Sequence, residues 1–121
     1  MNIERLRLAQ DWLRGEIEGP WFDMAHYVEA GPAAKNWCQT ACCIAGWACS
    51  QTQDFEGFSA RHSALRAFST GRDYFDLTEE QANELFLPGP RIVLFATREQ
   101  AHRAIETLIL TGTPDWSIQD V

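Results

Sequence analysis

Four cysteines fall within twelve positions of this 121-residue chain, in the stretch CQTACCIAGWAC at residues 38–49. Clustered thiols suit three kinds of chemistry: metal ligation, nucleophilic catalysis and disulfide exchange. A cysteine can also serve as a small hydrophobic residue in a packed helix. The spacing of the thiols, and the residues around them, decide among these roles.

Zinc is the first alternative. If the stretch is helical, Cys38, Cys42 and Cys49 lie along one stripe, because residues three or four apart face the same way. Cys38 and Cys42 would offer two thiolates, with Cys49 or His26 completing a tetrahedral set. However, zinc sites usually draw paired C-x₂₋₄-C knuckles from two places in a chain, and Cys43 points about 100° away from Cys42 on a helix. We therefore predict no metal and no other cofactor.

Catalysis by a thiol is not favoured either. A nucleophilic cysteine needs a base beside it, and His26, His62 and His102 lie far apart in the sequence. There is no C-x-x-C pair for disulfide exchange, and no phosphate-binding, metalloprotease or serine-hydrolase motif, so no enzymatic activity is predicted. The small residues instead predict close helix packing. The predicted structural motif is Cys38, Thr40, Cys43, Ala45, Gly46 and Trp47.

The composition predicts one cytoplasmic domain over residues 1–121, with a loosely docked tail at 113–121. At 45% hydrophobic residues, a chain of this length can bury a core without disulfides. The net charge of -7 and the scattered arginines disfavour a nucleic-acid surface, which needs clustered positive charge. The sequence shows no apolar signal segment and no run long enough to span a membrane. In a reducing compartment the cysteines are expected to be thiols.

Hydrophobic periodicity predicts an all-α fold of four to five helices around the cysteine-bearing one. Two helix starts are especially clear, because Thr78 with Gln81 and Thr97 with Gln100 have the spacing of a capping box. Gly112 suits the end of the last helix. One short strand is allowed near residues 92–95, where the run is too short to classify. The other helical segments are expected at residues 3–17, 38–50 and 59–69, with a short helical or irregular piece from residue 21.

Four stretches together resemble a scattered family of small proteins from bacteria and their phages that share a C-x-T-x-x-C-I-A-G core. They are FDM (22–24), CQTACCIAGWA (38–48), LTEEQANELF (77–86) and TREQAHRAIETLILTG (97–112). The resemblance implies a helical, cytosolic protein that is carried by a phage or by a bacterial chromosome, and implies no particular chemistry. Gln39 and Trp47 stand where members often carry glycine and histidine. The implied signature positions are Cys38, Thr40, Cys43, Ile44, Ala45 and Gly46.

The segment at residues 72–84 is strongly acidic, and Arg72 is its single basic residue. Such a run is usually a solvated helix face, since acids near a helix start are stabilised by the macrodipole. The alternative is a patch that steers binding to a basic protein, and this is the leading functional hypothesis. For a phage protein the partner would be a host nucleic-acid-handling enzyme, including a CRISPR effector that it would inhibit. The predicted partner-binding residues are Asp73, Asp76, Glu79, Glu80 and Glu84.

Two other functions compete with this hypothesis. The chain could be a small ligand-binding or enzymatic domain with a pocket near the cysteine helix. It could also self-associate through the face that carries Gly46. The five tryptophans of the chain fit either an interface or a core.

Overall fold

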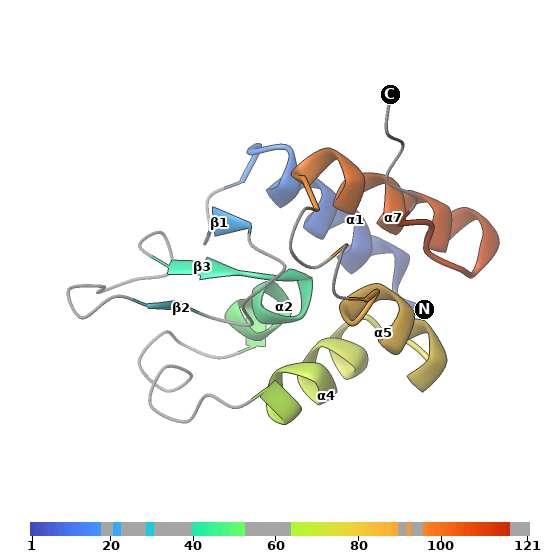
Figure 1. The fold of residues 1–121 in the computed structure, drawn as a ribbon, viewed down its shortest axis with the longest axis horizontal. Helices are drawn as coiled ribbons and strands as arrows, with labels where there is room; N and C mark the ends of the chain where they lie inside the picture. The colour runs from blue at the N-terminus through green and yellow to red at the C-terminus, as the bar shows by residue number, and fades with distance from the viewer. Residues whose placement is uncertain are drawn as a thin grey trace.

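The computed structural model describes residues 1–17, 21–22, 29–30, 40–52, 64–89, 92 and 96–116. Helices dominate this part of the chain, as Figure 1 shows. The all-α prediction with four to five helices is therefore confirmed. None of the described helices is long and apolar enough to cross a membrane. The helices are α1 (Ile3–Leu13), α2 (Ile44–Thr52), α4 (Ala64–Tyr74), α5 (Glu79–Phe86) and α7 (Arg98–Thr111).

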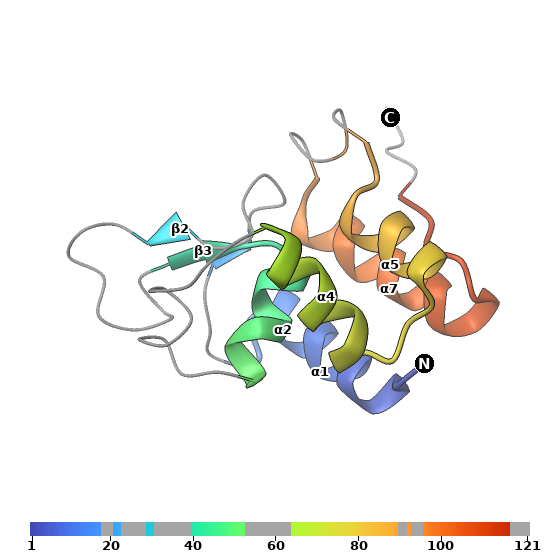
Figure 2. The ribbon, with the colours of Figure 1, turned by 90° about the horizontal axis from the view of Figure 1, so that it is seen from below.

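A small sheet lies beside the helices, at the left in both Figure 1 and Figure 2. Its strands are β1 (Trp21–Phe22), β2 (Glu29–Ala30) and β3 (Thr40–Cys42). β3 is central, with β1 parallel and β2 antiparallel to it. Strands of two or three residues are too short to show alternation in a sequence, so they were not predicted.

Helix α1 is shorter than the predicted span of residues 3–17. It begins after Asn2, whose side chain accepts a hydrogen bond from the Arg5 amide, and it ends at Leu13. Gly15 then takes a φ of 76°, which turns the chain out of the helix. The ends of the predicted apolar stripe are not buried, because Ile3 is 50% exposed and Ile17 is 37% exposed.

Both predicted capping boxes are present at the starts of α5 and α7. Thr78 exchanges hydrogen bonds with Gln81, and Thr97 does the same with Gln100. Each pair satisfies two amides that a helix start leaves without partners. Gly112 ends α7 with a φ of 81°, as its position in the sequence predicted.

The predicted strand near residues 92–95 does not form at its first residue. The Ile92 carbonyl accepts a hydrogen bond from the Ala96 amide at 2.8 Å, which is a helical pattern. Residues 93–95 lie outside the described part of the chain. Further on, the start of the tail docks through Trp116, which is 6% exposed and donates from Nε1 to the Glu84 carbonyl at 3.1 Å.

The core is one cluster that joins α1, α2, α5 and α7, and Phe68 of α4 packs against it. Trp47 of α2 is fully buried near its centre, stacked on Trp12 at 5.7 Å and on Phe75 at 6.1 Å between ring centroids. Stacked aromatic rings contribute about 0.5–1.5 kcal/mol per pair beyond the area that they bury. Helix α2 is therefore the central helix, as predicted for the cysteine-bearing segment.

At Gly71, α4 approaches its neighbours too closely to leave room for a side chain. A Cβ atom at this position would lie 2.9 Å from Cζ of Phe86 and 3.2 Å from the Cα of Ala45 in α2. The Ala45 backbone cannot move without shifting α2, so a side chain at position 71 would force the helices apart.

We expect Gly71→Ala to lower the free energy of unfolding by about 1 kcal/mol. Overpacking costs about 1–3 kcal/mol, and the better helix propensity of alanine returns about 1 kcal/mol. Urea denaturation measures the change. The cost should shrink in a Phe86→Leu background, because the shorter side chain leaves room for the new methyl group. An equal cost in both backgrounds would contradict the contact.

Candidate functional site

The cysteine stretch is not one helix, which corrects the prediction for residues 38–50. Thr40–Cys42 pair with β1 and β2 as strand β3, and α2 begins only at Ile44. Cys42 and Cys49 thus belong to different elements and share no helical stripe. The two other residues of the proposed zinc set, Cys38 and His26, lie outside the described residues.

The two cysteines whose side chains are described lie in the core. Cys43 is 2% exposed and Cys49 is 0% exposed. Burial raises the pKa of the Cys49 thiol to about 12, an effect that a hydrogen bond with Thr70 partly offsets. The thiol is therefore uncharged at neutral pH and unsuited to nucleophilic attack. Among the residues that the structure describes, no three His, Cys, Asp or Glu side chains are grouped to hold a metal ion.

Three more residues of the predicted structural motif are buried, whereas Cys38 lies outside the described residues. Ala45, Gly46 and Trp47 are buried in α2, and Thr40 begins β3. Trp47 carries one unusual feature: its Nε1 is buried and has no hydrogen-bond partner within the described part of the chain. A buried donor without a partner lowers the free energy of unfolding by about 1–3 kcal/mol. This cost offsets part of the stabilisation that the stacked Trp47 ring provides.

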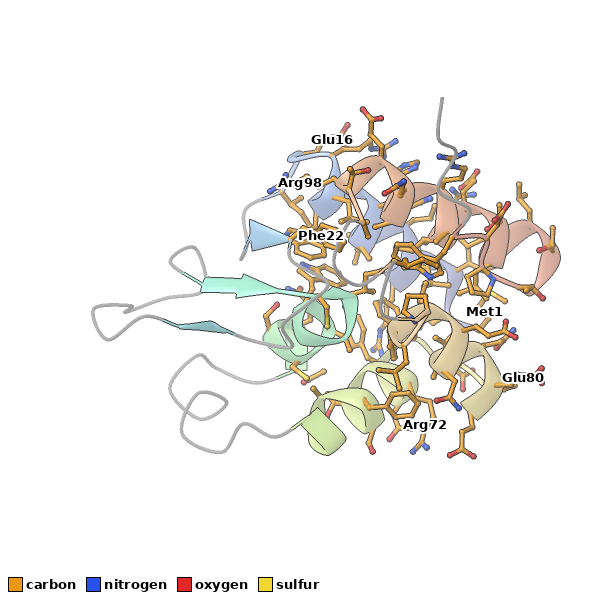
Figure 3. The ribbon with its side chains drawn as sticks, viewed as in Figure 1. Met1, Glu16, Phe22, Arg72, Glu80 and Arg98 are labelled. Carbon is orange, nitrogen blue, oxygen red and sulfur yellow. The ribbon has the colours of Figure 1, made fainter. Side chains whose placement is uncertain are left out.

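Four of the five predicted partner-binding residues gather where α4 ends and α5 begins. We call Asp73, Asp76, Glu79 and Glu80 the acidic corner. All four are exposed, with relative side-chain areas of 74% for Asp73 and 85% for Asp76. Figure 3 shows Glu80 at the outer edge of the helices, on the same side as Met1 and Arg72.

Two positive groups contact the acidic corner. Arg72 donates from Nε to Asp73 at 3.2 Å, and the ammonium of Met1 lies 3.5 Å from Oδ2 of Asp76. Exposed pairs of this kind contribute only about 0–1 kcal/mol, so they leave most of the negative potential in place. No described residue forms an ion pair with Glu79 or Glu80, and the corner stays strongly negative.

Asp76 holds an unfavourable backbone conformation. Its φ of 53° is the one positive value among the described non-glycine residues. Aspartate tolerates this region better than most residues, but glycine adopts it without a steric cost. A carboxylate thus stands at a turn position where glycine would fit more easily.

Glu84, the fifth predicted partner-binding residue, is less exposed than the acidic corner. It is half-buried on α5, one turn beyond Glu80, and lines a groove of about 460 Å³ with Leu87 and Trp116. Glu84 therefore differs from the four exposed acids in its partial burial and in lining this groove.

Comparison of the chain with protein-family models, with curated proteins and with solved structures finds no match. The proposals below therefore rest on the geometry and the chemistry of the chain itself.

Proposed function

We propose that the protein is an acidic cytoplasmic binding module that docks on a basic surface of another protein through the acidic corner. The observation that carries the proposal is the exposure of four carboxylates within eight positions, with two of them outside any ion pair with the described residues. Complementary charge accelerates encounter and selects partners by the sign of their surface.

The rival explanation is that these acids only stabilise the start of α5. The capping box does not need them, because Thr78 and Gln81 satisfy its two amides with their own side chains. The macrodipole of α5 stabilises Glu79 and Glu80 in its first turn. Asp73 gains nothing from α5, because it lies in the last turn of a different helix, α4. At the end of a helix a negative charge is unfavourable, so its presence there supports a role in binding.

The test compares two variants of equal charge. Glu79→Gln/Glu80→Gln neutralises half of the acidic corner, whereas Glu4→Gln/Glu99→Gln neutralises two other exposed first-turn acids. Each exposed charge pair contributes about 0.2–1 kcal/mol, so we expect the first variant to bind its partner roughly 2- to 30-fold more weakly at low salt. The second variant should bind as the parent does.

The partner is obtained by affinity capture from bacterial lysate at low and high salt, and affinities are then measured with the purified protein. A partner lost at high salt and lost with the Glu79/Glu80 variant alone supports the proposal. Equal weakening by both variants indicates a general charge effect and contradicts it. If the partner surface is the nucleic-acid channel of a host enzyme, as an anti-CRISPR role would require, added DNA will compete for it.

A further inference from the structure

A cleft lies at the opposite end of α1 from the acidic corner. It has a volume of about 630 Å³, which falls in the range of small-molecule sites. The last turn of α1 forms one wall and the first turns of α7 form the other. In Figure 3 the labelled Glu16 and Arg98 mark this end of the molecule. The described residues that line it are Leu13, Arg14, Glu16, Arg98, Glu99 and His102.

His102 lines the α7 wall of the cleft. Its Nε2 is buried and has no hydrogen-bond partner among the residues that the structure describes. His102 is itself half-buried, and its backbone carbonyl accepts from Gln10, which fixes this part of α7 against α1. A buried polar atom without a partner is destabilising, and a bound polar group would satisfy it.

Arg98 stands one turn before His102 on the same face of α7, because the two are four residues apart. No described residue pairs with its guanidinium, which extends toward α1 to within 3.9 Å of where a Cβ of Gly15 would lie. The other arginine of the cleft, Arg14, is already bound to Asp11 at 2.6 Å and lies 3.6 Å from Glu16. Among the described residues of the cleft, Arg98 is thus the available cation.

The unpaired guanidinium and the unsatisfied imidazole nitrogen on one helix face suit a carboxylate, since arginine binds both oxygens of a carboxylate in a fork. The positive end of α7 adds to the attraction. The methylene stems of the arginines offer apolar surface beside it, next to the buried Leu13 that lines the cleft. Glu16 and Glu99 at the rim would repel a ligand of several negative charges and would attract an ammonium.

We propose that this cleft binds the terminal carboxylate of an amino-acid-like ligand with an apolar side chain. The carboxylate lies on Arg98 and His102, and the side chain lies over Leu13. A free amino acid would place its ammonium near Glu16 and Glu99, whereas the carboxyl terminus of a peptide carries an amide there. The site is independent of the acidic corner.

The test uses three probes of similar shape on the isotopically labelled full chain, followed by NMR. They are L-phenylalanine, N-acetyl-L-phenylalanine and the uncharged N-acetyl-L-phenylalaninamide, each at roughly 10 mM, which would populate a site with a Kd near 1 mM. We expect the two carboxylates to shift the amide signals of residues 13–16 and 98–102, and the amide to leave them unchanged. Tighter binding of L-phenylalanine identifies a free amino acid, and tighter binding of its acetyl derivative identifies a peptide terminus.

Two matched arginine variants and one histidine variant locate the contact. Arg98→Gln should weaken binding of the carboxylate probes about tenfold or more, because a charge-assisted hydrogen bond is lost. Arg103→Gln removes an equal charge from an exposed position of α7 outside the cleft and should leave affinity unchanged. His102→Phe should weaken binding without lowering stability, since none of the described residues forms a hydrogen bond with Nε2. The proposal is overturned if no probe shifts these signals, if the amide binds equally, or if both arginine variants behave alike.

Discussion

Trp47→Ala is expected to lower the free energy of unfolding by about 3–5 kcal/mol, the usual cost of removing a large buried aromatic side chain. The ring is fully buried between Trp12 and Phe75, with interplanar angles of 17° and 13°, and Tyr74 contacts it edge-on at 6.0 Å. These rings belong to α1, α2 and the end of α4, so one truncation removes contacts among three elements. Urea denaturation followed by circular dichroism measures the loss.

Trp47→Phe is the matched control. It keeps an aromatic ring in the stack and removes the Nε1 donor that has no partner. The loss of ring area and the relief of the unsatisfied donor oppose each other, so stability should stay within about 1 kcal/mol of the parent. If phenylalanine costs as much as alanine, then Nε1 is satisfied in solution and the account of this core is wrong.

Features set by neighbouring residues could be predicted from the sequence. The capping boxes at Thr78 and Thr97 and the helix end at Gly112 each depend on contacts within three or four positions, and each forms as predicted. The exposed charges of the acidic corner could also be identified, because Asp76 and Glu80 lie in one acidic run. Their role in binding stays a prediction.

The cysteine stretch shows why other features could not be predicted. Residues 38–50 have small and apolar side chains that suit a helix, yet Thr40–Cys42 form a strand because Trp21–Phe22 and Glu29–Ala30 pair with them. That pairing is decided by segments ten or more positions away, and it overrides local preference. Because Cys42 lies in β3 and Cys49 in α2, the two residues do not belong to one helix.

The cleft could not be predicted for the same reason. Arg14 and Arg98 are far apart in the sequence, and neither stands in a motif. They come together because α1 and α7 pack side by side, with Gln10 of α1 donating to the carbonyl of His102. The sequence held one signal for this packing, because Gln10 is a polar residue beside the apolar positions of its helix. A polar side chain that is buried there needs hydrogen-bond partners on another element.

Gln10→Ala is expected to lower the free energy of unfolding by about 2–3 kcal/mol, because it breaks a buried hydrogen-bond network. Gln10 is 1% exposed. Its Nε2 donates to the His102 carbonyl at 3.2 Å and to the Glu106 carboxylate at 3.1 Å, and its Oε1 accepts from Arg7 at 2.9 Å. The change is measured by urea denaturation.

Gln10→Met separates the hydrogen bonds from the packing, because it keeps most of the side-chain volume. It should cost about 1–2 kcal/mol, less than alanine, since the cavity is filled. A methionine variant as stable as the parent would show that the network adds nothing and that Gln10 only fills space.

The same variant should change how stability depends on pH. The hydrogen bond from Gln10, followed by that from Arg7, lowers the pKa of Glu106 below its ordinary value of 4.5. A carboxyl whose pKa is lowered by folding stabilises the native state above the unfolded pKa, and this contribution is lost as the pH falls through the folded pKa. In Gln10→Met the pKa of Glu106 should rise toward 4.5, which NMR titration of its carboxyl carbon measures directly. Parent and variant should therefore differ less in stability in acid than at pH 7, and a constant difference would mean that Gln10 does not act on Glu106.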